Sequence, residues 1–97
     1  DIVSMSFGKA YSPDYQKVQE AFEYAASKNV LIVHASGNDD QDLDSHSHFP
    51  LRVKNSITDE QIPGWIEIGA SSAFKGSELA ADFSNYGKIN VDLFAPG

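Results

Sequence analysis

The sequence has no cysteine among its 97 residues, which excludes disulfide bonds and any metal or redox site built on cysteine. Long apolar runs are absent too, since its apolar segments are only a few residues long, whereas about 20 are needed to span a bilayer. We therefore expect no membrane partner, and a fold whose stability comes from packing, from assembly or from sequence outside these residues.

Basic residues are scarce and scattered. Seven lysines and arginines stand against 14 aspartates and glutamates, which gives a formal net charge of -7. Nucleic acids and anionic membrane surfaces are bound through clustered lysine and arginine side chains that neutralise phosphate groups. The charge balance therefore argues against nucleic acid as a partner.

The composition is sufficient for one modest hydrophobic core. Hydrophobic residues make up 41% and aromatic residues 11% of the chain, which is normal for a globular unit and unlike a disordered tail. The chain starts at Asp1 and stops at Ala-Pro-Gly with no closing element. We expect it to be an excised part of a larger domain.

The first third of the chain predicts a strand and a helix. The segment DIVSMSFG (1–8) places four apolar residues before a glycine, which predicts a core strand covered on both faces. In the helix that follows, Ser12 is the expected N-cap, Pro13 the first helical residue and Asp14 an acidic residue of the first turn. Spacing of three and four residues predicts an apolar stripe formed by Tyr15, Val18, Ala21, Phe22 and Ala25.

The rest of the chain predicts three more strands and a long loop. The helix is expected to end near Lys28 and Asn29, before the buried strand VLIVHA (30–35). Residues 36–64 predict a long polar loop, which in a compact unit is usually functional. WIEIGASS (65–72) and INVDLFAPG (89–97) predict strands, and AADFSNYG (80–87) a surface turn. The fold class is α/β, with a mainly parallel sheet of about four strands and a flanking helix.

Small residues end every predicted strand, in the segments SFG, ASGN, GAS and APG. Open parallel sheets bind ligands at the carboxyl ends of their strands, so these segments predict a site there. Turns use the same residue types for purely structural reasons, and spacing alone does not separate the two interpretations.

Six segments in order give a more specific signal. They are VSMSFG (3–8), VLIVHASGN (30–38), FP (49–50), WIEIGAS (65–71), DFSNYG (82–87) and VDLFAPG (91–97). Together they resemble the middle of the catalytic domain of subtilisin-like serine peptidases. The resemblance implies a partial three-layer α/β fold over residues 1–97, within a serine endopeptidase that hydrolyses peptide bonds through an acyl-enzyme.

The resemblance also implies a role for particular residues. Asn38, the last residue of the Ala-Ser-Gly-Asn turn, matches the catalytic side chain that donates to the oxyanion of the tetrahedral intermediate, and Gly37 is expected to leave space beside it for the substrate. Ser6, Phe7 and Gly8 match the segment that pairs with substrate backbone, with Phe7 facing an apolar subsite. The facing wall of the specificity pocket would be Ala35, Ser36 and Gly37. His48, just before Phe49–Pro50, matches the floor of that pocket, where it and the acidic run Asp39, Asp40, Asp42 and Asp44 would favour polar or basic substrate side chains.

The other histidines and acids support no metal site. His46 and His48 flank Ser47 near Asp44, but nothing fixes further ligands at useful spacing. His34, inside a predicted strand, is expected to be buried and hydrogen-bonded and not a catalytic base. Asp92 matches a position that contributes to a weak cation site in some subtilisin-like relatives. No cofactor is expected in this segment, although the resemblance admits calcium elsewhere in the full-length protein.

The catalytic Asp, His and Ser expected for the family have no counterparts in residues 1–97. We therefore expect the isolated chain to be inactive, because the hydroxyl, its base and the orienting carboxylate must act together. Two alternatives stay open: a catalytically dead subtilisin-like binding protein, and a standalone α/β binding domain, which would lack the usual glycine-rich phosphate loop. The resemblance suggests an extracellular or cell-envelope location and a peptide or protein substrate. Unpaired strand edges predict self-association of the excised piece.

Overall fold

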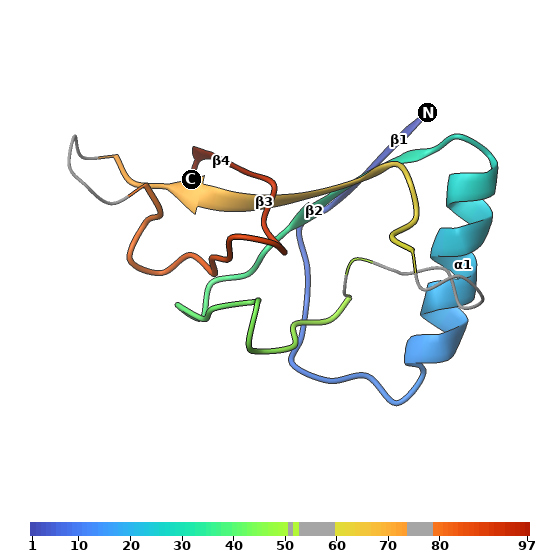
Figure 1. Cartoon of the computed structure of the whole chain (residues 1–97), viewed down its shortest axis with the longest axis horizontal. Helices are drawn as coiled ribbons and strands as arrows, with labels where there is room; N and C mark the ends of the chain where they lie inside the picture. The colour runs from blue at the N-terminus through green and yellow to red at the C-terminus, as the bar shows by residue number, and fades with distance from the viewer. Residues whose placement is uncertain (51, 53–59, 74–78) are drawn as a thin grey trace.

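The computed structural model describes residues 1–50, 52, 60–73 and 79–97, and it contains four strands and one helix (Figure 1). In chain order these are β1 (Ile2–Met5), α1 (Tyr15–Ser27), β2 (Leu31–Ala35), β3 (Trp65–Ser71) and β4 (Leu93–Pro96). The predicted helix and all four predicted strands are therefore confirmed, with shifts of a few residues at their ends.

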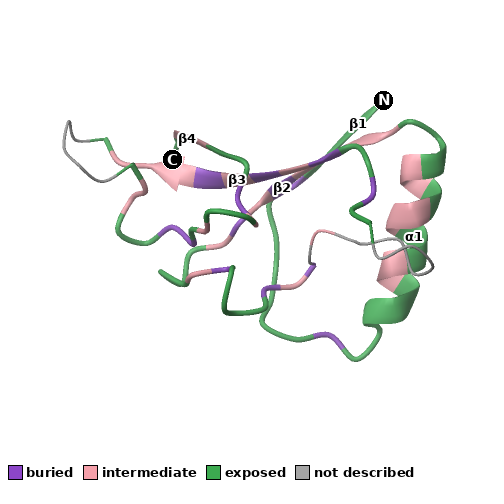
Figure 2. Cartoon of the chain, in the orientation of Figure 1, coloured by how far each residue is buried: buried purple, intermediate pink, exposed green. Residues whose placement is uncertain are grey.

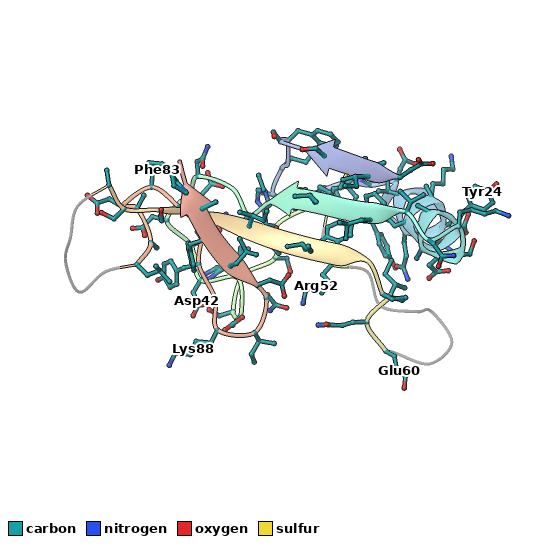
Figure 3. All side chains as sticks on the ribbon, turned by 90° about the horizontal axis from the view of Figure 1, so that it is seen from above. Tyr24, Asp42, Arg52, Glu60, Phe83 and Lys88 are labelled. Atoms are coloured by element: carbon teal, nitrogen blue, oxygen red, sulfur yellow. The ribbon has the colours of Figure 1, made fainter. Side chains whose placement is uncertain are left out.

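The four strands form one parallel sheet in the order β1-β2-β3-β4. Figure 3, which looks onto the sheet, shows β2 and β3 between the two edge strands. Met5 is in register with His34, and His34 is in register with Glu67 on β3. The sheet confirms the predicted α/β class, and it brings the ends of β1, β2 and β3 together at one edge.

One face of the sheet carries the core. Along β2, residues alternate between buried and half-buried positions, so that Ile32 and His34 lie on the covered face. Ile32 packs with Met5, Ile62 and Trp65, and the ring of Phe22 from α1 meets Trp65 edge-on at a centroid distance of 4.9 Å. This contact fixes α1 against the sheet.

The opposite face of the sheet is apolar and only half-buried. It presents Leu31, Val33 and Ala35 from β2 and Ile66 and Ile68 from β3. Within the described ranges no second helix covers it, and Figure 1 shows α1 and the long connections on the other side. The described residues therefore form two layers, the sheet and α1. This bare face adds to the expectation that the isolated chain self-associates, which stays a prediction.

β1 is an edge strand, so its prediction as a core strand covered on both faces is wrong. Ile2 is 69% and Val3 45% exposed, and only Met5 at its end is buried. The apolar run was correctly interpreted as a strand. Ile2 is in register with Leu31 on the uncovered face of the sheet, and Val3, on the covered face, has no neighbouring strand on its outer side in the described part of the chain.

The start of α1 also differs from the prediction. The helix begins at Tyr15, with Asp14 rather than Ser12 at the N-cap position, and the Asp14 side chain makes no capping hydrogen bond. Pro13 and Asp14 form a turn before the helix, and Ser12 is buried ahead of it. Asn29 ends the helix in the left-handed region at φ 56°, as expected.

The apolar stripe of α1 is shorter than predicted. Val18, Phe22 and Ala25 are half-buried, but Tyr15 is 59% exposed and Ala21 is exposed. Figure 2 shows the first turn entirely in the exposed colour. Only the later turns reach the sheet, where Trp65 lies.

The long connection after β2 holds no strand or helix in residues 36–50 and 60–64, as predicted. Its remaining residues, 51 and 53–59, lie outside the described ones apart from Arg52. In the described part of the chain, no helix has the length and apolar character to cross a membrane.

Candidate active site

The turn after β2 is built around the side chain of Asn85. The Oδ1 atom of Asn85 accepts from the backbone N–H groups of Asp39 and Gln41, both at 3.0 Å, and its Nδ2 donates to the carbonyl of Ser36 at 2.8 Å. Its backbone N–H donates to the carbonyl of Gly37 at 2.9 Å. One fully buried amide therefore fixes the path of the chain on both sides of Asn38.

Residues 84 and 85 are among the most deeply buried in the described chain, so the prediction of a surface turn over 80–87 is wrong there. Ser84 is 1% and Asn85 0% exposed. The hydroxyl of Ser84 accepts from the N–H of Ala70 on β3 at 2.9 Å. The polar sequence Ser-Asn is typical of a turn, but here it satisfies buried backbone groups of distant segments.

Asn38 lies on this turn with its side chain exposed. Among the described residues its amide has no hydrogen-bond partner, so both of its N–H groups are free to donate. Gly37, immediately before it, has φ +102°, a left-handed value that favours glycine. The turn thus presents one unpaired amide donor from a rigid support.

His48 lies between the two segments predicted to form the walls of a substrate cleft. A Cβ placed on Gly8 would overlap His48 Nε2, and one placed on Gly37 would lie 3.0 Å from the same atom. Lys9 and Phe49 exchange backbone hydrogen bonds of 2.7 Å, which tie the His48 segment to the end of the β1 segment. His48 itself is 8% exposed, so it is not a solvated loop histidine.

The structure therefore brings the predicted wall and floor residues together, with two differences. Ser36 is 1% exposed, and its hydroxyl donates to the carbonyl of Asn85 at 3.2 Å, so its side chain belongs to the interior and not to a pocket wall. The space beside Gly37 is also not open: Asn85 Nδ2 lies 2.5 Å and His48 Cε1 2.9 Å from where a Cβ would stand. Ser6, Phe7 and Gly8 are all exposed, with Phe7 at 65%.

Two aspartates of the acidic run, Asp39 and Asp44, make different contacts. Asp39 Oδ2 lies 4.0 Å from His48 Nδ1 and is the one carboxylate of the run paired with that ring in the described structure. Asp44 instead accepts from the backbone N–H groups of residues 88–90, at 2.7 to 3.2 Å. Partial desolvation raises the pKa of Asp44, but hydrogen bonds from Lys88, Asn90 and Ile89 outweigh it and leave the pKa below the ordinary 3.8.

His34 is buried and hydrogen-bonded, as predicted. Its Nδ1 lies 2.8 Å from Glu67 Oε1 and its Nε2 lies 2.9 Å from the carbonyl oxygen of Phe7. Sequence reasoning missed Glu67, which is 3% exposed and also accepts from the indole N–H of Trp65 at 2.7 Å. The available signal was its position in register with His34 on the covered face of two neighbouring strands.

The described residues offer no metal centre. No group of three or more histidine, cysteine, aspartate or glutamate side chains in the described ranges is placed to hold an ion. His46 is exposed and its Nδ1 lies 3.2 Å from the carbonyl oxygen of Asp42. Asp92 Oδ2 accepts from the Glu67 N–H at 2.7 Å and forms an ion pair with Arg52, which would compete with a cation for that oxygen.

Comparison with known proteins gives a consistent result. A curated protein named subtilisin-like protease 2, from Pseudogymnoascus destructans, is 38% identical over 96 residues, which is 99% of this chain and 20% of that protein. Alkaline protease 1 of Emericella nidulans is 37% identical over 98% of this chain and 19% of its own length. The chain therefore spans about a fifth of the length of these curated relatives.

Solved structures agree with the sequence relatives. A cold-adapted subtilisin-like serine proteinase matches with a TM-score of 0.68 and 27% identity, covering 99% of this chain and 29% of that one. Sphericase matches with a TM-score of 0.64 and 27% identity, covering 99% and 31%. Neither comparison supports a standalone α/β binding domain. The profile of the subtilase family, peptidase S8, matches residues 1–97, and the chain belongs to that family.

Proposed function

We propose that the full-length protein is a serine endopeptidase and that residues 1–97 supply its oxyanion donor and two walls of its substrate cleft. The observation on which this rests is the exposed amide of Asn38, which has no hydrogen-bond partner among the described residues and lies on the turn at the carboxyl end of β2. Membership of the subtilase family and relatives named as proteases support the reaction class. On this proposal, the catalytic Asp, His and Ser belong to parts of the protein outside these residues.

Asn38 would act when a serine hydroxyl attacks the scissile carbonyl. The carbonyl oxygen then becomes an oxyanion, and a donor that is already fixed stabilises it without reorganisation. Asn85 supplies the fixing, because it binds the backbone on both sides of Asn38. The Asn38 side chain is left free to donate toward the reacting oxygen.

The cleft walls would hold an extended peptide. Segment Ser6–Gly8 follows β1 directly, and its exposed residues would pair their backbone with the substrate. The exposed ring of Phe7 offers an apolar contact beside it. Ala35 to Gly37 form the facing wall through their backbone, since the Ser36 side chain points inward.

His48 would set the depth of the specificity pocket between these walls. Its imidazole is in close contact with Gly8 and Gly37, so it shortens the space available to a substrate side chain. The Asp39 carboxylate 4.0 Å from Nδ1 adds negative charge at the same floor. We expect small, polar or basic substrate side chains to be preferred over large aromatic ones.

A peptide or protein is the partner that this function requires, and an extracellular or cell-envelope location suits it. The relatives named as alkaline and subtilisin-like proteases support the first statement. The second rests on the family resemblance, and is tested by whether the full-length protein appears in the medium or envelope fraction of cells that produce it.

Covalent labelling with a fluorophosphonate probe tests the proposal, since the probe reacts with an activated serine. The full-length protein should be labelled much faster than a heat-denatured control. The isolated chain of residues 1–97 should be labelled no faster than its own denatured control, because it lacks the triad. A folded full-length protein that resists the probe would instead be a catalytically dead subtilase that serves in binding.

A further inference from the structure

A buried polar network runs across the sheet from the hydrophobic core to segment Ser6–Gly8, which we propose pairs with the substrate. It joins Trp65 and Glu67 on β3 to His34 on β2 and ends at the carbonyl of Phe7, just beyond β1. His34 is 1% and Glu67 3% exposed. None of these side chains belongs to the proposed oxyanion site or to a cleft wall.

The hydrogen atoms of this network follow from its two ends. The Phe7 carbonyl can only accept, so His34 Nε2 carries a hydrogen and donates it across 2.9 Å. The Trp65 indole can only donate, so Glu67 Oε2 accepts across 2.7 Å. The middle contact, 2.8 Å between His34 Nδ1 and Glu67 Oε1, holds one further hydrogen, on either atom. In both cases the pair is neutral as a whole and Nε2–H is retained.

The surroundings hold this arrangement in place. The ring of Phe22 meets Trp65 edge-on, and the His34 ring lies 5.4 Å from the Trp65 ring, centroid to centroid. The N–H of Glu67 donates to Asp92, whose carboxylate pairs with Arg52. The donor at His34 Nε2 is therefore oriented by a second layer of packed and hydrogen-bonded groups.

Stability alone does not account for a buried acid and histidine at this position. Desolvating such a pair is costly, and replacing both members with apolar residues of similar volume is often neutral or stabilising. What an apolar pair cannot do is hold the Phe7 carbonyl in one direction. Successive carbonyl groups of an extended chain point to opposite sides, so strand-like pairing of a peptide with the backbone of Ser6 and Gly8 requires the Phe7 carbonyl to point inward.

We infer that His34 is a positioning residue: its Nε2–H, oriented by Glu67, holds the Phe7 carbonyl inward and thereby fixes the backbone groups of Ser6 and Gly8 that pair with an extended peptide. This inference rests on the proposed peptidase function. It assigns to His34 and Glu67 no contact with the substrate and no proton transfer in the reaction. Their effect should appear in substrate binding along the cleft and not in the chemistry at the scissile bond.

The test compares two double variants in the full-length protein. His34→Leu with Glu67→Leu removes the donor without leaving a buried charge unpaired. His34→Gln with Glu67→Gln restores the chain of hydrogen bonds. The amide nitrogen at position 34 donates to the Phe7 carbonyl, and the amide nitrogen at position 67 donates to the amide oxygen at position 34. The amide oxygen at position 67 still accepts from Trp65. His46→Leu, at an exposed histidine, is the matched control.

The readout is kcat/KM on two substrates, a tetrapeptide p-nitroanilide and a single-residue ester, which have the same residue at the cleaved bond. The loss of kcat/KM in each variant is compared between the two substrates. The double leucine variant should lose roughly tenfold in kcat/KM on the tetrapeptide, mainly through KM, and little on the ester. The double glutamine variant should recover most of the loss, and His46→Leu should match the wild type. Equal losses on both substrates, or no loss on either, would overturn the inference.

A second measurement does not depend on activity. With histidine labelled in nitrogen-15, the spectrum of the full-length protein should show His34 Nε2 carrying a hydrogen protected from solvent exchange, and the double leucine variant identifies the signal. An unprotonated Nε2 overturns the inference even if the enzyme is active. A wild type that cleaves neither substrate refutes the peptidase function and, with it, the substrate role, while the spectrum still decides whether His34 holds Phe7.

Discussion

Replacing Asn85 with alanine should loosen the turn that presents Asn38. The substitution leaves two backbone N–H groups, of Asp39 and Gln41, and the carbonyl of Ser36 without their partners. At about 1 kcal/mol for each lost hydrogen bond, the free energy of unfolding should fall by about 3 kcal/mol. This loss is a large part, though not all, of the free energy of unfolding of a typical protein, which is about 5–15 kcal/mol. Because Asn38 loses its support, kcat should also fall by at least about tenfold.

Urea denaturation and peptide hydrolysis of the full-length protein measure the two effects. Asn90→Ala is the matched control, because its amide donates to a loop carbonyl, that of Leu43, without touching the turn. It should cost only about 1 kcal/mol and leave kcat unchanged. Asn85→Asp separates the acceptor role of this side chain from its donor role. The carboxylate still accepts from the two N–H groups, but it cannot donate to the Ser36 carbonyl and is repelled by it. If Asn85→Ala is as stable and as active as the wild type, the turn does not depend on this side chain and the reasoning fails.

Two further predictions concern neighbouring groups. His48→Gly should deepen the specificity pocket and raise kcat/KM for aromatic relative to small substrate side chains by about tenfold or more, measured on a matched peptide series; an unchanged preference would place His48 outside the pocket. Asp44 has a pKa below the ordinary 3.8, so its carboxylate stabilises the folded state above that pH, and the stabilisation is lost as the pH falls through the lowered value. The difference in free energy of unfolding between the wild type and Asp44→Asn should therefore become smaller as the pH falls. A difference that stays constant from neutral to acid pH would contradict this.

Local sequence patterns predicted the elements of this fold well. The apolar runs over β1 to β4, the left-handed Asn29 and the buried His34 are local signals, and each is confirmed. The exposure of β1 was not predictable, because burial of an edge strand depends on what covers its two faces and on what pairs with its outer side. The start of α1 at Tyr15 shows the usual weakness of boundary predictions from capping residues alone.

The site shows the same division between local and distant signals. Asn38, Gly8 and His48 could be selected because the family motif surrounds them in the sequence. Asn85 and Glu67 could not, since their partners lie more than 30 residues away in the chain: Asn85 binds Ser36, and Glu67 binds His34. The spacing of apolar residues in the sequence predicts which face of a helix or strand a residue occupies. It does not predict which buried polar groups meet on that face.

The most direct test of the central claim is the turnover number of the Asn38→Ala variant of the full-length protein. If Asn38 is the oxyanion donor, kcat should fall about 100- to 1,000-fold with KM little changed, a magnitude taken from removal of such a donor in subtilisin itself and not worked out from this structure. Fluorophosphonate labelling should persist in the variant, because the serine nucleophile is untouched. An unchanged kcat in a correctly folded Asn38→Ala protein would contradict the account.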